Sequence, residues 1–534
     1  MRRFGLFGAI LVALGVVYVA AWRTHPGGAT AATQSGAPQT VAVTSVTRSC
    51  PPPAPGAGAA HIAMIAMSSQ STAARTGSGA GGTTPGSAAL SAVPVGAGQP
   101  GTAGQPAKAR QSAKATQPTA TATPTGKATG KSTPAGQSTT PAAAAQPVTA
   151  SAPGALTVVT APAATGFGGT AVAATGQMAE GFEAEQSDAS GMGVVSCTHP
   201  GSDMWFVGTG ASAGASTIRL YLMNTGDLAA SADVTLLTDA GVQPGLDSAV
   251  TVSPHEYAMV NVAPLVRGSV ALALHVQTAS GQVAASVWEG AGKSGAWLPQ
   301  SAAPSTTVVI PGLTVARSAA RLFVTVPGAA DAQLKVVAFT PAGKFPQFGS
   351  TPVDAPAGAT SSFALSSLGA SAAGLVLSSS VPVIASVLVP GSGIGAFTTA
   401  VAPVTEQGVI AGNPATRGLT VGLVLTAPTA AAHAEVTAIG VGAPGASVVG
   451  APQAVTVQAG HTMAVAVPRP GNSRQPFAIV ITPQAGSGPL YAARVVTSGT
   501  SGLSAPVTSL LPVPSALTTI TLPPAQNTYS AVLP

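Results

Sequence analysis

A short alternating pattern recurs three times in the second half of the chain. In Gln282–Trp288, apolar side chains occupy every second position, with Val283 and Val287 on the same face, as in a half-buried β-strand. Pro382–Leu388 and Pro489–Val495 repeat the pattern, at offsets of 100 and then 107 residues. Each copy closes a similar run of short strands and Gly or Pro turns, so the pattern predicts a tandem array of β modules.

The units between these copies have the strand spacing of a β-sandwich. In the first unit, runs such as 218–224 and 232–238 alternate and are separated by turn signals about every 8–12 residues. We therefore predict an all-β fold with three immunoglobulin-like β-sandwich modules, at 155–300, 303–402 and 405–523. A β-propeller is the alternative, although its blades usually repeat every ~40–50 residues.

An uncharged apolar run precedes the modules. Residues 4–22 carry no charge and follow Arg2 and Arg3. A signal peptide has an apolar core of about 7–15 residues and a membrane-spanning helix needs about 20, so the length favours a membrane anchor. Ala29–Ala31 offers a small-residue cleavage site, which favours secretion instead. We expect residues 1–25 to be a signal peptide or anchor of a single-pass cell-membrane protein whose bulk is extracellular, or of a secreted protein.

The composition changes between this segment and the modules. Two short strand-like runs in residues 36–67 are expected to join the first module. Residues 68–154 are rich in Ala, Thr, Pro, Gly and Ser and contain no acid, so they would bury too little apolar surface to offset the entropy of ordering. We predict a disordered, solvated spacer there, with binding of its scattered cations to acidic wall polymers as the alternative. Residues 524–534 are expected to form a C-terminal tail.

Charge is scarce and unevenly distributed. Charged residues make up 7% of the chain, against roughly 25% in a typical globular protein. Residues 1–179 carry ten Lys and Arg and no acid, while the remainder carries eleven basic and fifteen acidic residues. The modules have no basic patch of the kind that nucleic-acid binding needs, so nucleic acid is not expected as a partner. Glu180, Glu183, Glu185 and Asp188 lack the spacing of a calcium loop and are interpreted as a solvated turn.

Cys50 and Cys197 are the only cysteines of the chain. Two cysteines in an exported protein most often pair, so we predict a Cys50–Cys197 disulfide that ties the early strand to the first module. A metal site at Cys197 and His199 would have too few ligands.

The motifs that resemble catalytic or phosphate-binding loops lack the required context. Gly210-Ala-Ser212-Ala-Gly214 matches a nucleophile elbow, but a strand beginning at Ile218 follows it in place of a helix. The glycine-rich stretches at 77–82 and 440–445 fail in the same way, because one lies in the low-complexity tract and the other contains Pro444. We expect no catalytic residue, cofactor or metal, and so a chain that is not an enzyme.

The aromatic residues of the first module are the least ordinary feature of the sequence. Trp205, Trp288 and Trp297 belong to this module, together with Tyr221 and Tyr257. Tryptophan usually fills the core of a sandwich, which is the favoured interpretation. The alternative is a ligand platform on which sugars or peptides stack.

Four blocks of the sequence resemble an actinobacterial family of exported proteins of unknown function, an uncharacterised domain family. They are Arg48–Pro52, Trp205–Gly208, Arg219–Gly226 and Leu511–Ser515. The resemblance implies a location in the cell envelope and assigns no catalytic residue. We expect a non-enzymatic structural or adhesive envelope component that contacts the membrane through residues 4–22 and has cell-wall polymers or other envelope proteins as further partners. A glycan-binding accessory protein that uses the first-module aromatics is the alternative.

Overall fold

The computed structural model describes two units of the chain, which are treated separately. The described residues are 39–58, 60–67, 85–94, 149–150 and 152–522, with short gaps in the last range at 162–166, 189–192, 245, 247, 293, 315–319, 350, 366–371, 392–393, 472–473, 500–501 and 505–506. One unit comprises residues 1–42 and 519–534, and the other comprises residues 43–518. In the first, β1 (Gln39–Ala42) pairs antiparallel with β37 (Thr519–Leu522). The predicted segments 1–25 and 524–534 lie outside the described residues.

The larger unit is all-β, and its sheets group into four pairs that each enclose a hydrophobic core. The N-terminal pair contains β2 (Ser45–Cys50), β3 (Ala60–Ile65), β4 (Ala88–Pro94), β5 (Thr149–Ala150), β6 (Thr157–Ala161), β7 (Phe167–Thr175), β8 (Glu183–Asp188) and β9 (Val194–Ser196). Pair 1 contains β10 (Asp203–Thr209), β11 (Thr217–Met223), β12 (Ala230–Thr238), β13 (Gly241–Gln243), β14 (Val250–Val252), β15 (Tyr257–Asn261), β16 (Ala271–Ser280), β17 (Ala284–Ala291) and β18 (Ser294–Leu298).

Pairs 2 and 3 follow in chain order. Pair 2 contains β19 (Ser305–Leu313), β20 (Arg321–Thr325), β21 (Ala332–Thr340), β22 (Gly343–Pro346), β23 (Val353–Ala355), β24 (Thr360–Ala364), β25 (Ala373–Val389) and β26 (Ala396–Thr399). Pair 3 contains β27 (Gln407–Asn413), β28 (Leu419–Ala427), β29 (Ala432–Val441), β30 (Ser447–Val449), β31 (Gln453–Val457), β32 (His461–Ala466), β33 (Phe477–Pro483), β34 (Tyr491–Ser498), β35 (Val507–Pro512) and β36 (Ser515–Ala516). The helices of the described part are short 3-10 turns: η1 (Gly176–Met178), η2 (Ala211–Ala213), η3 (Ala263–Leu265) and η4 (Gly502–Ser504).

The four pairs share one strand order. In pair 1 the sheets run β10-β16-β12-β13 and β15-β11-β17-β18, and pair 3 repeats this as β27-β33-β29-β30 and β32-β28-β34-β35. Pair 2 follows the same order with one change, since the 17-residue strand β25 belongs to both sheets. Its first half pairs with β21 and its second half with β20. The N-terminal pair, with β2-β7-β4-β5 and β6-β3-β8-β9, is a fourth copy.

The stretch that recurs in the sequence has the same structural role in pairs 1 to 3. It forms β17, the second half of β25, and β34, each of which is hydrogen-bonded on both sides in its sheet. The second residue of each copy pairs with the segment leading into the same sheets: Val283 with Gly201, Val383 with Ser305, and Leu490 with Val404. Val283, Val383 and Leu490 are at most 1% exposed. Alternation in the sequence therefore marks a central strand.

The fourth copy corrects two expectations from the sequence. Strands β6 to β9 lie within the predicted first module, yet they pair with β2 to β5 in separate sheets with their own core. Residues 88–94 and 149–150, inside the tract expected to be disordered, form β4 and β5. Strand β5 pairs with the first residues of β4, as β14 pairs with the first residues of β12. The low-complexity residues 95–148, which lie outside the described part, therefore take the place of residues 239–249 of pair 1.

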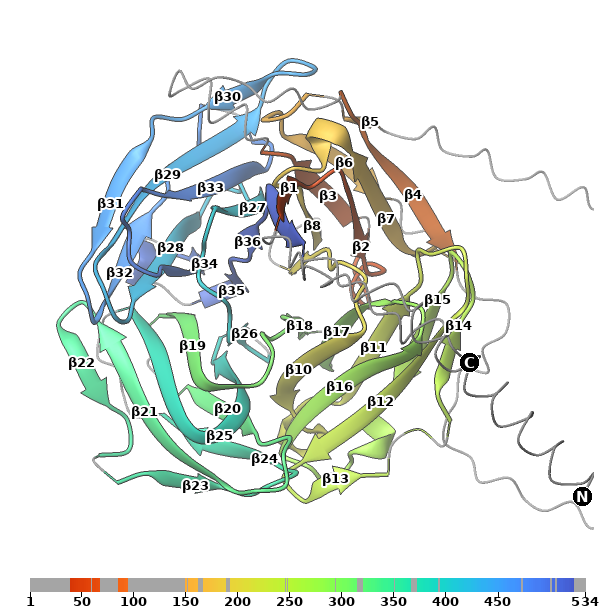
Figure 1. Cartoon of the computed structure of the whole chain (residues 1–534), viewed down its shortest axis with the longest axis vertical. Coiled ribbons are helices and arrows are strands. Elements are labelled where there is room, and N and C mark those ends of the chain that lie inside the picture. The colour runs from red at the N-terminus through yellow and green to blue at the C-terminus, as the bar shows by residue number, and fades with distance from the viewer. Residues whose placement is uncertain are drawn as a thin grey trace, which may run out of the picture. The chain divides into compact units, whose positions relative to one another are not determined.

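Successive pairs contact one another, and pair 3 also contacts the N-terminal pair through β27 and β8, which lie side by side in Figure 1. Each unit of the repeat has two sheets around one core, which differs from the single four-stranded sheet of a propeller blade, and the described residues form no closed propeller.

Within the described part, no helix is long and apolar enough to cross a membrane. The apolar run at 4–22 lies outside that part.

The cores are not confined to single pairs. The core of pair 2 includes Val424 and Val495 from pair 3, and the core of pair 1 includes Phe323 and Phe397 from pair 2. A segment cut at 303–402 would therefore lose part of its core. The pairs stabilise one another in addition to folding around their own strands.

Ala385 provides a test of this packing, because it lies in the second half of β25, is 0% exposed and faces the core of pair 2. We predict that Ala385→Asp in the full chain lowers the free energy of unfolding by roughly 3–5 kcal/mol, since the carboxylate would have no partner there. Chemical denaturation monitored by circular dichroism measures the loss. Ala330→Asp, on an exposed turn, is the control and should change little; equal stability of the two variants would contradict the assignment.

Candidate functional site

The two cysteines are joined in a disulfide, with a Cα–Cα distance of 4.2 Å. Cys50 ends β2 and Cys197 follows β9, so the bond links the two sheets of the N-terminal pair within its core. Cys50 is 0% exposed and Cys197 is 2% exposed. The bond therefore lies within the N-terminal pair, and it does not connect that pair to pair 1.

The tryptophans do not form an open platform. Trp205, Trp288 and Trp297 are only 6–7% exposed. Trp288 and Trp297 meet edge to face, with ring centroids 5.1 Å apart, in a small cluster that also contains Tyr221. Trp205 stacks on His275, with centroids 3.8 Å apart. Large aromatic side chains bury well in a sandwich, and this burial removes the faces on which a sugar would stack.

The segment Gly210–Gly214, which matches the nucleophile-elbow motif, has a structural role in this chain. Ser212 lies in η2, and its hydroxyl donates to the carbonyl of Ser269 at 2.6 Å. A turn follows the motif, and then the strand β11. Among the described residues, no group of three His, Cys, Asp or Glu side chains could hold a metal ion.

The junction between the N-terminal pair and pair 3 holds a buried polar network that the sequence did not reveal. Around it, apolar side chains from both pairs form one cluster, in which Ala63 and Ile65 from β3 meet Val409 and Ala411 from β27. The sequence gives no sign of this contact, because the partners lie more than 300 residues apart.

Gly412 is at the centre of the network. Its amide donates to Oε2 of Glu185 at 3.0 Å, and its carbonyl accepts from Nη1 of Arg494 at 3.4 Å. The Arg494 Nη2 donates to Ser509 at 2.7 Å. The backbone of one glycine thus links an acid of the N-terminal pair to an arginine of pair 3.

Both charged side chains of this network are completely buried. Burial raises the pKa of Glu185 to about 7, although the attraction of Arg494 and the amide of Gly412 lower it. Burial also lowers the pKa of Arg494 to about 10, while Glu185 raises it. Each charge is therefore compensated chiefly by the other and by backbone dipoles.

The acidic cluster expected to be a solvated turn is buried. Glu180, Glu183 and Glu185 are 1–4% exposed, and the last two belong to strand β8. Glu183 forms an ion pair with Arg48 at 2.7 Å, and burial, the largest influence, raises its pKa. Arg48 precedes Glu183 by 135 residues. Three glutamates so close in sequence suggest a solvated surface, and the arginines that compensate two of them, Arg48 for Glu183 and Arg494 for Glu185, lie far away in the sequence.

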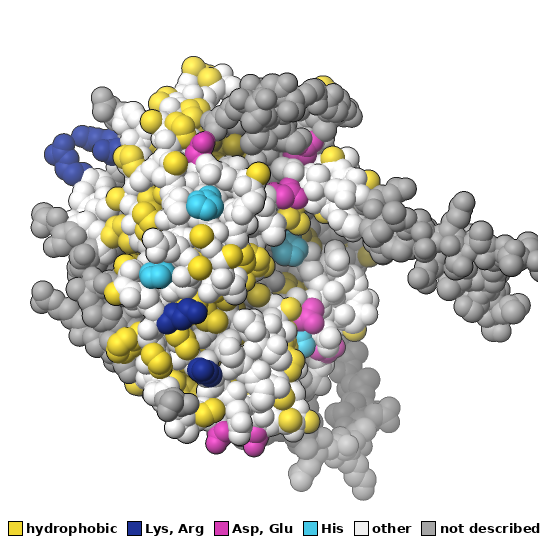
Figure 2. Space-filling model, turned by 60° about the vertical axis from the view of Figure 1, so that its left-hand side comes forward, with side chains coloured by type: hydrophobic (Ala, Val, Ile, Leu, Met, Phe, Trp, Pro, Cys, Tyr) yellow, Lys and Arg dark blue, Asp and Glu magenta, His cyan; other side chains and the backbone are white. Residues whose placement is uncertain are grey.

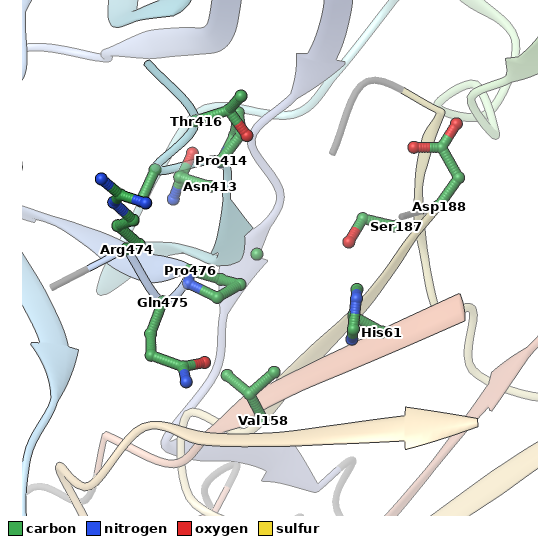
Figure 3. Close-up of a pocket in the computed structure, with 12 residues that line it drawn as sticks. His61, Val158, Ser187, Asp188, Asn413, Pro414, Thr416, Arg474, Gln475 and Pro476 are labelled. Carbon is green, nitrogen blue, oxygen red and sulfur yellow. The ribbon is translucent and has the colours of Figure 1, made fainter. Parts of the chain in front are cut away.

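A cavity of about 400 Å³ opens at the same junction. Figure 3 shows its two walls, with His61, Ser187 and Asp188 from the N-terminal pair facing Asn413 and Arg474 from pair 3. Asn413 is fixed, because its amide donates to the carbonyls of Ile410 and Phe477. Asp188 accepts from the amide of Gly193 at 3.1 Å, and His61 is hydrogen-bonded to Thr160. The walls therefore carry both positive and negative charge.

A second cavity of about 390 Å³ adjoins the first and shares Pro414, Ala415 and Thr416 with it. Two arginines line this second cavity, Arg417 and Arg469, and no acid does. On the face of the molecule shown in Figure 2, charged side chains are few.

One buried acid lies apart from these cavities. Glu289, in β17 of pair 1, is 0% exposed and accepts hydrogen bonds from the amide and hydroxyl of Thr209. No cation among the described residues pairs with it. Burial raises the pKa of Glu289 to about 8, although the two bonds from Thr209 lower it.

The chain matches one family model over residues 148–468, and the model is described as a family of unknown function, DUF5719. The match begins in the N-terminal pair, spans pairs 1 and 2, and ends in pair 3. No curated protein and no solved structure matches the chain.

The raised pKa of Glu289 predicts how the stability of the protein changes with pH. Between about pH 5 and pH 8 the folded chain keeps the proton of Glu289 and the unfolded chain has lost it, so stability falls as the pH rises, by about 1.4 kcal/mol per pH unit. We predict that Glu289→Gln makes this slope shallower by about 1.4 kcal/mol per pH unit, while the buried Glu183 and Glu185, whose pKa values are also raised, keep their own contributions, and that the variant is more stable than wild type at pH 8. Chemical denaturation at several pH values measures it.

The exposed Asp233→Asn is the control and should leave the slope unchanged. A Glu289→Gln protein with the pH slope of the wild type would show that the carboxyl of Glu289 is ionised in the folded state.

Proposed function

Because the chain belongs to the DUF5719 family of unknown function, we propose its role from its own structure: a non-enzymatic structural or adhesive component of the cell envelope, exported and held at the membrane by residues 4–22. The observation that carries the proposal is the buried disulfide between Cys50 and Cys197. Structural disulfides form and persist in oxidising compartments and are rare in the cytosol. The apolar run behind Arg2 and Arg3 supplies a route of export.

The architecture supports a structural role. Four sheet pairs of one strand order pack on each other through shared cores, as expected of a stiff array. We propose that these pairs are immunoglobulin-like sandwiches with exchanged edge strands. β11 pairs with β15 and β12 with β16, as the B–E and C–F strands of that fold do, while β10 lies beside β16 and β17 beside β11, where that fold has A beside B and G beside F. The glycan-binding alternative lacks support, since the side chains of Trp205, Trp288 and Trp297 are buried.

Export can be tested with a reporter. An alkaline phosphatase that requires disulfides for activity is fused after Pro534, and we predict high activity in the native host. Deletion of residues 4–22 should abolish the activity while leaving fusion protein in the cytoplasm. Activity that is independent of residues 4–22, or none in either strain, would contradict the proposal.

The structural role needs a separate measurement. The full chain should co-sediment with purified envelopes of the native host and should remain bound after its membrane lipids are extracted, because cell-wall polymers or envelope proteins are the proposed partners. Complete release on lipid extraction would leave the membrane as its only partner and would contradict an adhesive role.

A further inference from the structure

The cavity bordered by Arg417 and Arg469 has the features of an anion site. It measures about 390 Å³, within the range of about 300–1,000 Å³ that ligand pockets occupy. Its polar lining includes the two arginines, Thr416 and Thr420, and no Asp or Glu. A cavity with this lining favours a negatively charged ligand.

One of the two arginines is held in place. Nη1 of Arg469 donates to the carbonyl of Ala415 at 2.7 Å, which leaves the other N–H groups of its guanidinium for a ligand. Arg417 forms no hydrogen bond or ion pair with any described residue, and its side chain is exposed. It lies within a tight turn in which the amide of Leu419 donates to the carbonyl of Thr416, and Gly418 has a φ of +86°.

The acids of pair 3 do not neutralise these arginines. Glu406 accepts two bonds from Thr518, and Glu435 lies beside Thr437 on β29. Neither glutamate lines the cavity. Two exposed positive charges therefore share a concave site in a chain with very few charges.

A third arginine extends the site. Arg474 lines the adjoining cavity, and it too forms no hydrogen bond or ion pair with a described residue. The two cavities share the segment Pro414–Thr416, so an elongated ligand that fills one reaches the border of the other. Asp188 on the far wall of the adjoining cavity would repel an anion, which makes the Arg417–Arg469 cavity the principal site and Arg474 an auxiliary contact.

We propose that this cavity binds a phosphate group of a chain-like polyanion, with Arg417 and Arg469 on the first group and Arg474 near a second. The guanidinium fork matches the oxygens of phosphate and of carboxylate. A phosphate group offers more acceptor oxygens than a carboxylate, and Thr416 and Thr420 offer the additional donors. Binding at this site does not depend on whether the protein is exported, so the two proposals can fail independently.

Calorimetric titration of the full chain at low ionic strength tests the proposal, with tripolyphosphate and inorganic phosphate as probes. We expect one tripolyphosphate per chain, bound at least tenfold more tightly than inorganic phosphate and weakened by added salt. Arg417→Gln and Arg469→Gln should each weaken both probes about tenfold or more. Arg474→Gln should weaken tripolyphosphate and leave inorganic phosphate unchanged.

Two further variants distinguish binding in this cavity from a general attraction between the anion and the positive charges of the protein. Arg267→Gln removes an equal charge from an exposed position in pair 1 and should change nothing. Arg469→Lys keeps the charge but loses the fork, and should weaken binding several-fold without lowering the melting temperature.

Three outcomes would overturn the proposal. They are equal losses in Arg267→Gln and Arg417→Gln, no measurable tripolyphosphate binding, and tighter binding of poly-glutamate, titrated in the same way, than of tripolyphosphate.

Discussion

The contact of Gly412 with Glu185 and Arg494 is the constraint on which the arrangement of the larger unit depends. A Cβ atom at position 412 would lie 3.3 Å from both Cβ and Oε2 of Glu185, so a side chain there would press on Glu185, and a large one would push the two pairs apart. Glu185 and Arg494 are each completely buried, and losing either one would leave the other uncompensated, at a cost of roughly 3–5 kcal/mol. The N-terminal pair and pair 3 are therefore bound to a specific mutual register.

Hydroxyl groups play a similar part at other junctions. Ser386 of pair 2 donates to the carbonyl of Val207 in pair 1 at 2.8 Å, and Thr360 donates to Leu237 at 2.9 Å. Thr198 donates to the carbonyl of Ala285 at 3.2 Å, between the N-terminal pair and pair 1. Short hydroxyl side chains satisfy buried carbonyls and let the strands approach closely. In a chain with 7% charged residues, Ser and Thr hydroxyls thus supply polar contacts between the pairs.

The sequence predicted the features that depend on local pattern. The alternation around Val283 and Val383 located two central strands, and the presence of only two cysteines predicted the disulfide. It missed the fourth sheet pair for two physical reasons. Low-complexity residues interrupt that copy, and its central strand β8 carries two acids, Glu183 and Glu185, in place of the apolar alternation seen around Val283 and Val383. Burial of those acids depends on arginines far away in the sequence, which no local pattern encodes.

Hydrogen exchange measured by mass spectrometry on Gly412→Leu tests the account most directly. The account predicts that exchange accelerates in β27 and also in β3 and β8, although these two strands precede Gly412 by more than 200 residues. Gly328→Leu is the control, because a Cβ atom at position 328 would have no other atom within 4 Å. Faster exchange in β27 alone, with β3 and β8 as protected as in the wild type, would contradict the claim that the N-terminal pair is held by pair 3.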